Sequence, residues 1–277
     1  SVTAADNLSQ PRQIKFWTGS CQLAYGFFYP PVHSTFRGKE SEKPPLIVMC
    51  HGGPTGCTTA ALNLKIQYWT NRGFAVADLN YRGSSGFGRQ YRESLNGYWG
   101  KADIEDTEYL VNYLSLEGLV DPKRCIIRGS SAGGYTVLAA LTFTQTFSAG
   151  ASYYGIGDLE AIAEDTHKFE SRYLDSLIGP LSSKQKRYYD RSPIHHAERL
   201  NCPVIFFQGL NDRVVPPNQA QMMVKALERK KIKVQHVTYA NESHGFRQSE
   251  NIIDSLEKEL SFYREVFDLE SFNDDVV

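Results

Sequence analysis

The chain has 277 residues, of which 41% are hydrophobic and 12% aromatic, and this composition excludes an intrinsically disordered protein. Its 30 Lys and Arg residues nearly balance its 31 Asp and Glu residues, so no global basic field is available for nucleic acid or an anionic membrane. The five cysteines include no C-x-x-C pair, which favours free thiols in a reducing compartment over a disulfide framework or a zinc site. We expect a soluble, cytoplasmic protein, because no apolar stretch is long enough for a transmembrane helix and no signal-peptide pattern occurs.

The first forty residues predict a hairpin. Residues 14–29 form two strand-like runs around the turn Thr18-Gly19-Ser20, and Pro30-Pro31 ends the second run. We expect residues 1–40 to form an antiparallel hairpin or arm at the edge of a sheet.

Beyond residue 45, apolar runs alternate with helix-period stretches. The predicted strands are residues 46–50, 74–79, 125–129, 149–154, 204–209 and 233–239. The predicted helices are residues 61–72, 103–116, 131–144, 217–229 and 250–267. This order predicts an α/β fold whose mostly parallel central sheet has helices on both faces. Residues 155–200 interrupt the alternation and are rich in charge and Tyr, so we expect a cap-like insertion over one end of the sheet.

The sharpest motif is the G-x-S-x-G of residues 129–133, directly after one predicted strand and directly before a predicted helix. In a nucleophile elbow the central Ser sits on a strained strand-to-helix turn, between small residues that let the turn close. Ser131 is therefore the candidate nucleophile. The five-residue pattern alone is weak, and its strand-turn-helix context carries the prediction; the alternative is a Ser that only caps the helix.

A Ser hydroxyl needs an adjacent base, and His is the usual one. His244 follows the last predicted strand, at the carboxyl edge of the sheet where ligands bind in open parallel sheets. Asp212 follows the strand before it and could orient the imidazole. The order Ser131, Asp212, His244 is typical of α/β-hydrolases. Acyl transfer also needs oxyanion donors, for which we expect the Ala132 N–H and a second N–H from the Gly-rich turn at residues 51–54.

Six motifs, taken together, resemble the catalytic domain of the prolyl oligopeptidase family. The resemblance is to its acylaminoacyl-peptidase and dipeptidyl- or aminopeptidase-like branch, and residues 166–179 are similar to its bacterial members that hydrolyse puromycin. In order along about 200 residues, the motifs are HGGPTG (51–56), NYRGSSGFGRQY (80–91), W-G-x-x-D-x-x-D (99–106), GSSAGGY (129–135), QGLNDRVVPP (208–217) and ESHGF (242–246).

This resemblance implies an α/β-hydrolase fold and a serine peptidase that uses no metal or organic cofactor. It implies Ser131, Asp212 and His244 as the catalytic triad and the N–H groups of Gly53 and Ala132 as oxyanion donors. It also suggests that Tyr135 and Tyr154 line the substrate pocket, with packing as the alternative, and that Arg82 contacts substrate or orders the site entrance, with a structural role as the alternative. The acidic residues of the insertion are candidates to bind a substrate ammonium, with a solvated acidic face as the alternative: Glu160, Glu164 and Glu170.

Family members usually carry a β-propeller before the hydrolase domain, and residues 1–277 leave room for the hydrolase domain only. We expect either the catalytic part of a longer, propeller-containing protein or a stand-alone enzyme that is gated otherwise, for example by self-association. The predicted activity is hydrolysis of small peptides or aminoacyl amides. The alternatives are an esterase for small acyl esters and a non-catalytic binding module on the same fold.

Overall fold

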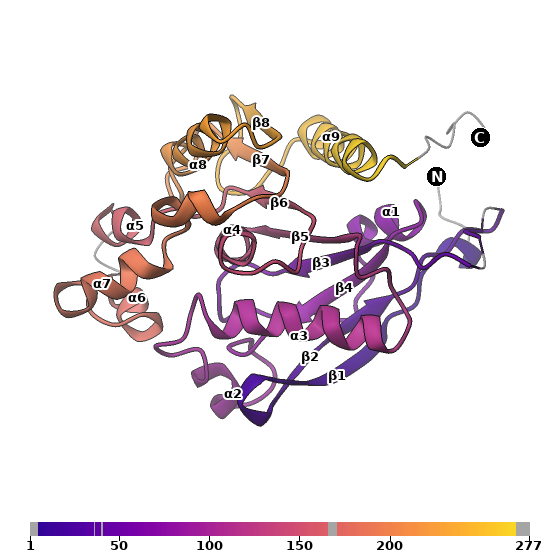
Figure 1. Ribbon diagram of the computed structural model, residues 1–277, viewed down its shortest axis with the longest axis horizontal. Helices are drawn as coiled ribbons and strands as arrows, with labels where there is room; N and C mark the ends of the chain where they lie inside the picture. Colours follow the sequence, from indigo (N-terminus) through magenta and orange to yellow (C-terminus); the bar gives the residue numbers. More distant parts are fainter. Residues whose placement is uncertain (1–4, 36, 40, 166–170, 270–277) are drawn as a thin grey trace.

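A computed structural model describes residues 5–35, 37–39, 41–165 and 171–269 (Figure 1). At its centre lies a sheet in which the eight strands of the described residues run in the order β1-β2-β4-β3-β5-β6-β7-β8. The strands are β1 (Arg12–Thr18), β2 (Gln22–Tyr29), β3 (Leu46–Cys50), β4 (Ala75–Asn80), β5 (Cys125–Ser130), β6 (Ala149–Tyr153), β7 (Val204–Gly209) and β8 (Val234–Tyr239).

The sheet is mostly parallel, as the alternation of strands and helices predicts. β1 and β2 form the expected antiparallel hairpin around the short helix η2 (Gly19–Cys21), and β2 joins the sheet antiparallel to β4. All further pairs, from β4 through β3 to β8, are parallel. The carboxyl ends of β3 to β8 consequently meet at one edge of the sheet, which is where the predicted catalytic side chains follow their strands.

Helices cover both faces of the sheet (Figure 1). α3 (Ala102–Leu116), α4 (Ala132–Phe143) and α8 (Asn218–Arg229) pack into the larger apolar core on one face. α1 (Leu64–Thr70) and α9 (Ser249–Phe267) pack into a second core on the other face. α1 begins three residues later than predicted because the Asn63 side chain accepts a hydrogen bond from the Lys65 N–H at 3.0 Å and caps it. No helix within the described ranges has the length and apolar character needed to cross a bilayer.

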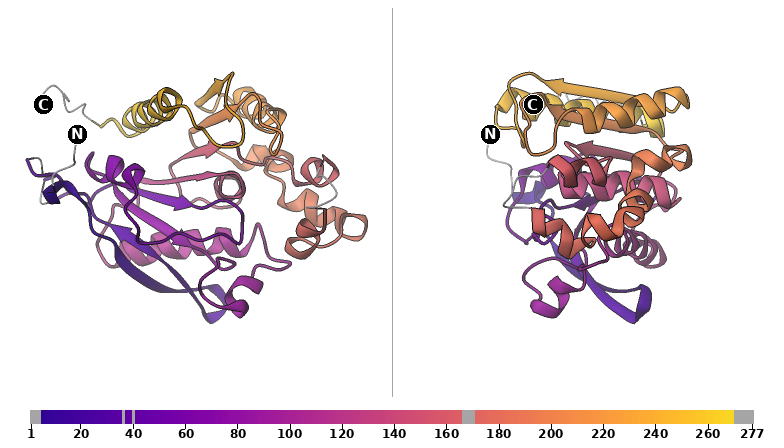
Figure 2. Two further views of the ribbon diagram at one scale, coloured as in Figure 1. Left: turned by 180° about the vertical axis from the view of Figure 1, so that it is seen from behind. Right: turned by 90° about the vertical axis from the view of Figure 1, so that its left-hand side faces the viewer.

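The segment 155–200 forms α5 (Leu159–Asp165), α6 (Ser171–Leu177), α7 (Leu181–Arg191) and the 3₁₀ helix η3 (Pro193–Arg199). These helices lie to one side of the sheet, opposite α1 (Figures 1 and 2). The Ser192 hydroxyl accepts a hydrogen bond from the Leu159 N–H at 2.9 Å and donates one to the Tyr188 carbonyl at 2.8 Å, so it ties α5 to α7. The segment follows β6 and therefore starts at the carboxyl edge of the sheet. The described part of the chain also contains the short helix α2 (Arg89–Glu93) and, near its start, η1 (Ala5–Asn7).

Candidate active site

Ser131 lies between the end of β5 and the start of α4, on a strained turn. Its φ of 57° and ψ of −121° fall in a region that non-glycine residues rarely adopt, at a cost on the order of 1–3 kcal/mol. The Ser131 N–H donates to the Tyr153 carbonyl of β6 at 2.9 Å, which helps to hold the turn in this conformation. Strain of this kind, maintained by the surrounding sheet, is what a nucleophile elbow requires.

The glycines around Ser131 are needed because backbone atoms approach them closely. A Cβ atom on Gly133 would overlap the Cys50 carbonyl of β3, and one on Gly129 would lie 2.5 Å from the Gly133 carbonyl oxygen. Both positions therefore admit only glycine without rearrangement of the backbone. The G-x-S-x-G spacing thus has a steric cause: α4 starts in direct contact with β3 and β5.

The structure brings Ser131, His244 and Asp212 together from the ends of β5, β8 and β7. His244 Nε2 lies 2.9 Å from Ser131 Oγ, and His244 Nδ1 lies 2.8 Å from Asp212 Oδ2. The Asp212 side chain is fully buried, whereas 24% of the His244 side chain is exposed. The other carboxylate oxygen of Asp212 accepts the N–H groups of Val214 and Val215 at 2.8 and 2.9 Å. These bonds fix the carboxylate, so that Nδ1–H can donate to it while Nε2 faces the serine.

A second carboxylate, Glu242, holds the loop that carries His244. Its oxygens accept the N–H groups of Arg247 and Gln248 at 3.0 and 2.9 Å and the Asn251 side-chain amide at 2.9 Å. Burial alone would raise the pKa of Glu242, but these hydrogen bonds to its charged form outweigh burial and lower that pKa. The carboxylate is therefore ionised at neutral pH and pins the start of α9 against the histidine loop.

The Gly-rich turn after β3, here taken as residues 51–56, lies beside the nucleophile elbow. A Cβ atom on Gly52 would be 3.4 Å from the Ser131 Cβ atom, and Gly53 has a φ of +50°, which favours glycine. On the other side of the elbow, Ala132 is the first residue of α4, so its N–H has no partner within the helix. The two N–H groups expected to bind an oxyanion, those of Gly53 and Ala132, thus come from two segments that flank Ser131.

The two tyrosines expected to contact substrate have different surroundings. Tyr154, with a φ of 39°, places its ring 4.9 Å from the His244 imidazole, and its N–H donates to the Phe207 carbonyl at 2.7 Å. Tyr135 is fully buried: its ring packs on Trp99, and its hydroxyl donates to the Arg191 carbonyl of α7 at 3.0 Å. Tyr154 borders the site, whereas Tyr135 is a packing residue that exposes no surface to a substrate, which corrects the expectation for it.

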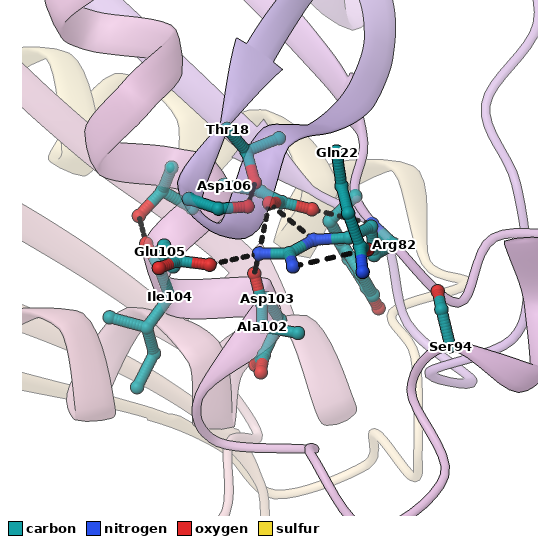
Figure 3. A network of polar contacts seen from close by, with 12 residues as sticks. Thr18, Gln22, Arg82, Ser94, Ala102, Asp103, Ile104, Glu105 and Asp106 are labelled. Carbon is teal, nitrogen blue, oxygen red and sulfur yellow. Dashed lines mark hydrogen bonds and ion pairs between the residues drawn. The ribbon is translucent and has the colours of Figure 1, made fainter.

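The Arg82 side chain is surrounded by acidic and polar side chains of the protein itself. Its guanidinium Nε donates to Asp106 at 2.9 Å, its backbone N–H donates to the other Asp106 oxygen at 2.6 Å, and a further guanidinium nitrogen pairs with Glu105 (Figure 3). A third guanidinium nitrogen lies 3.3 Å from the Gln22 side-chain oxygen of the hairpin. Only 6% of Arg82 is exposed, and its charge is paired within the protein, which agrees with the structural alternative for this side chain.

Two of the three acidic residues named in the insertion lie within the described residues. Glu160 accepts a hydrogen bond from the Gln185 side chain of α7 at 2.8 Å, and Glu164 is exposed. Glu170 lies outside the described residues. Within those described residues, no group of three or more His, Cys, Asp or Glu side chains could hold a metal ion.

Sequence reasoning missed the residues that contact the Gly-rich turn. Ser84 Oγ lies 2.7 Å from His51 Nε2, and the Ser85 hydroxyl donates to the Thr55 carbonyl at 2.5 Å. Glu242 is the first residue of the ESHGF motif, but its residue type does not by itself predict the hydrogen bonds it makes. The available signal was position: Ser84 and Ser85 lie in the 80–91 motif, to which no triad residue belongs, and Glu242 lies two residues before His244.

The chain matches the model of the prolyl oligopeptidase family over residues 60–270. It belongs to the prolyl oligopeptidase family. Among curated relatives, it is 31% identical to dipeptidyl aminopeptidase BIII of Pseudoxanthomonas mexicana over 220 residues, which is 77% of this chain and 32% of that protein. This assignment and the fold agree with the resemblance found in the sequence motifs.

Solved structures of family members superpose closely on this catalytic domain. A puromycin-hydrolysing peptidase of Mycobacterium tuberculosis is 44% identical, with a TM-score of 0.95, and the match covers 98% of this chain and 41% of that one. An acylaminoacyl peptidase solved with Z-Gly-Gly-Phe-chloromethyl ketone is 25% identical, with a TM-score of 0.85, over 97% of this chain and 43% of that one. The fold is therefore that of the α/β-hydrolase peptidases, and the chain spans about a third to two fifths of the length of these relatives.

Proposed function

We propose that this chain is the catalytic domain of a serine peptidase that cleaves peptide or aminoacyl-amide bonds of small substrates. The observation that carries the proposal is the continuous hydrogen-bonded series from Ser131 Oγ through His244 to the buried carboxylate of Asp212, with both distances below 3.0 Å. Geometry of this kind is the signature of a serine nucleophile activated by a general base. Because the chain belongs to the prolyl oligopeptidase family, we expect its substrates to be peptides.

The reaction follows from these positions. Ser131 Oγ attacks the scissile carbonyl carbon while His244 Nε2 takes its proton, and Asp212 stabilises the imidazolium that forms. The carbonyl oxygen becomes an oxyanion that accepts hydrogen bonds from the N–H groups of Gly53 and Ala132. His244 then gives its proton to the leaving amine, which departs and leaves an ester on Ser131. Water attacks this ester with His244 again as base, and the acid product and free Ser131 are released.

A fluorophosphonate probe and aminoacyl 4-nitroanilides test this function together. We expect the probe to label wild-type protein at Ser131, and the variant Ser131→Ala to lose labelling and to lower kcat by a factor on the order of 10⁴–10⁶. Ser41→Ala is a matched control, since Ser41 is exposed and precedes the start of β3, at the edge of the sheet opposite the triad, and it should keep both activities. Folded wild-type protein that is not labelled would contradict the proposal and favour a binding module.

An esterase uses the same machinery, and the choice between the two reactions depends on the leaving group. Turnover of 4-nitrophenyl acetate together with turnover of the anilides agrees with a peptidase, because a serine peptidase cleaves activated esters as well. Efficient ester hydrolysis without any anilide hydrolysis would instead establish the esterase.

We further propose that residues 1–277 act as one hydrolase domain with the hairpin at 1–40 and the cap at 155–200, within a protein that has a further domain over its site. The relatives are much longer than this chain. Within the hydrolase domain, α6 of the insertion contacts the Gly-rich turn through Tyr173 and Thr55, whose hydroxyls lie 2.9 Å apart.

The five cysteines are free thiols, in keeping with a cytoplasmic compartment. Light scattering, with and without added N-terminal sequence, would reveal self-association.

A further inference from the structure

A hollow of about 910 Å³ lies between α3 and α7. Its lining comes from the turn at residues 97–101, the first half of α3, the end of α4 and α7. None of the three triad residues belongs to this lining. The hollow is therefore separate from the candidate active site, and its volume is that of a site for a small molecule.

Arg191, at the end of α7, is the buried cation of this hollow. Three arginines are buried among the described residues, and two of them, Arg82 and Arg128, pair with carboxylates. Arg191 instead donates to two carbonyl oxygens, those of Trp99 at 2.7 Å and Gly97 at 2.9 Å. No carboxylate in the described part of the chain forms an ion pair with it, and its Nε is buried without a hydrogen-bond partner there.

The charge of Arg191 is incompletely compensated by its surroundings. Burial lowers the pKa of Arg191, and the positive charge of Arg187 lowers it further. The acidic groups nearby offset this effect only in part. An arginine remains protonated in spite of such a shift, so the hollow contains a buried positive charge without a paired anion. A bound anion would supply the missing partner.

Three further cations line the same hollow and have no ion-pair partner among the described residues: Lys101, Lys184 and Arg187. The Arg187 guanidinium donates to the Ile178 carbonyl at 2.6 Å, which fixes the side chain and leaves other N–H groups of the fork available. A Cβ atom on Gly97 would lie 3.9 Å from a nitrogen of Arg187, so this side chain reaches the turn to which Arg191 is bonded.

The acidic residues of the lining are mostly paired with other groups. Asp190 pairs with Lys186 at 2.7 Å, and Glu105 pairs with Arg82. Glu108 accepts a hydrogen bond from a threonine hydroxyl at 3.0 Å, and burial raises its pKa. Even with Glu108 ionised, the four unpaired cations leave the hollow with a net positive charge.

The lining also offers aromatic surface. Tyr98 is 60% exposed and Phe143 is partly buried, and both side chains belong to the lining. The planar fork of an arginine matches the oxygens of a phosphate group, and lysines add positive charge without a fixed geometry. A ligand with a doubly charged anionic group and an aromatic body would use both features of the hollow.

We propose that the hollow between α3 and α7 is a binding site for a small organic dianion such as a phosphate monoester. Arg187 and the two lysines bind its charged group, which also offsets the charge of the buried Arg191. Tyr98 and Phe143 contact its organic body. This inference is independent of the proposed peptidase function, because the site shares no lining residue with the triad. Bound ligand stabilises the folded protein, since unfolding destroys the site.

Calorimetric titration of the protein with phenyl phosphate at pH 7.5 tests the site, because the ester is a dianion at that pH. We expect a dissociation constant of about 1 mM or lower. Phenol lacks the charge and should not bind, whereas inorganic phosphate lacks the ring and benzoate has one charge, so each should bind at least about fivefold more weakly. No binding of phenyl phosphate at about 10 mM, or equal binding of benzoate or phenol, would overturn the proposal.

The variant Arg187→Gln locates the binding site. It should weaken phenyl phosphate about tenfold or more, since a charged hydrogen-bond donor to the ligand is lost. Arg89→Gln is the matched control, because it removes the same charge from an exposed pair with Glu93 in α2, outside the lining. The control should bind within about twofold of wild type. Equal weakening in the two variants would show an effect of net charge alone and contradict the site.

The double variant Lys101→Gln, Lys184→Gln replaces this test if Arg187→Gln does not fold, because both lysines are exposed. It should also weaken phenyl phosphate about tenfold, and unchanged binding would overturn the assignment. Ser131→Ala should bind phenyl phosphate like wild type, whereas protection of Ser131 from the fluorophosphonate probe by phenyl phosphate would place the ligand in the active site and contradict a second site. Bound phenyl phosphate without any probe labelling would overturn the peptidase function alone.

Discussion

Two buried arginines, one on each side of the sheet, are paired with carboxylates in different ways. Arg128 of β5 donates to both oxygens of Glu259 of α9, at 2.8 and 3.0 Å, and the hydroxyls of Tyr153 and Tyr263 donate to the same two oxygens at 2.6 and 2.7 Å. The Glu259 side chain is fully enclosed. The Arg82 cluster is more open, since 38% of the Glu105 side chain reaches solvent.

The difference shows how the fold supports the two sides of the site. The Arg128 cluster joins α9 to β5 and β6, the strands that lead to Ser131 and Tyr154, and its carboxylate has a donor for each of four acceptor positions. The Arg82 cluster supports the turn at residues 81–85, which contacts His51, and there burial raises the pKa of Asp106 to about 6, even though Arg82 acts to lower it. The strands that lead to Ser131 are thus fixed by the Arg128–Glu259 ion pair, whose hydrogen bonds are all formed. The turn at residues 81–85 depends instead on Asp106, a carboxyl group that can take up a proton.

Removal of Glu259 should have the largest effect. We expect Glu259→Ala to lower the free energy of unfolding by about 3–5 kcal/mol, because Arg128 becomes an unpaired buried charge. Denaturant unfolding at neutral pH measures this loss. The neighbouring Lys258→Ala, which breaks an exposed pair with Asp254, is the control and should cost less than about 1 kcal/mol. Equal losses in the two variants would show that the Arg128 cluster contributes no more than a surface pair.

Asp78 provides a third case, because it is buried on the same face of the sheet as Arg128 but has no arginine in direct contact. Burial raises its pKa to about 6, against the effect of the hydrogen bond from Thr58. When folding raises the pKa of an acid, the protein loses stability as the pH rises from the pKa of that acid in the unfolded state toward its pKa in the folded state. Asp78→Asn should therefore stabilise the protein by up to about 3 kcal/mol above pH 7 and by little at pH 4.

The control for this prediction is Asp121→Asn. Burial acts to raise the pKa of Asp121, but hydrogen bonds from the Lys123 N–H and the Arg124 side chain outweigh it and lower that pKa. Asp121→Asn should therefore slightly destabilise the protein at pH 7, whereas Asp78→Asn should stabilise it. Denaturant titrations at pH 4 and pH 7.5 measure both variants, and destabilisation by Asp78→Asn at both pH values would contradict the expected sign.

Arg82→Met should have the smallest effect of the three, and one that depends on pH. Loss of Arg82 removes an interaction that lowers the pKa of Asp106, so that pKa rises further above about 6. We expect a loss of about 1–3 kcal/mol at pH 8, where the buried carboxylate is ionised without its partner, and a smaller loss at pH 5, where it binds a proton. Arg89→Met, in an exposed pair with Glu93, should change nothing at either pH. A loss that is equal at pH 5 and pH 8 would show that Asp106 does not titrate in this way.

The sequence determined the fold class and the order of the elements because both are local. β3 and β7 have their predicted bounds, since short apolar runs between polar or glycine-rich turns are local signals for buried strands. Ser131, Asp212 and His244 could be chosen because each follows a strand, and parallel strands bring their carboxyl ends to one edge whatever else the chain does. Their distances agree with that choice.

Tertiary structure decided the roles of side chains whose partners are far away in the chain. Tyr135 has the position of a pocket residue in the motif, but α7 packs over it and buries it completely. Arg128 and Glu259 are 131 residues apart, and no local pattern links them. His51 and Ser84 lie in two separate motifs, and only the close approach of their turns makes them partners. A periodic pattern records which face of an element is buried, whereas hydrogen-bond partners depend on which elements meet, and that is settled when the layers pack.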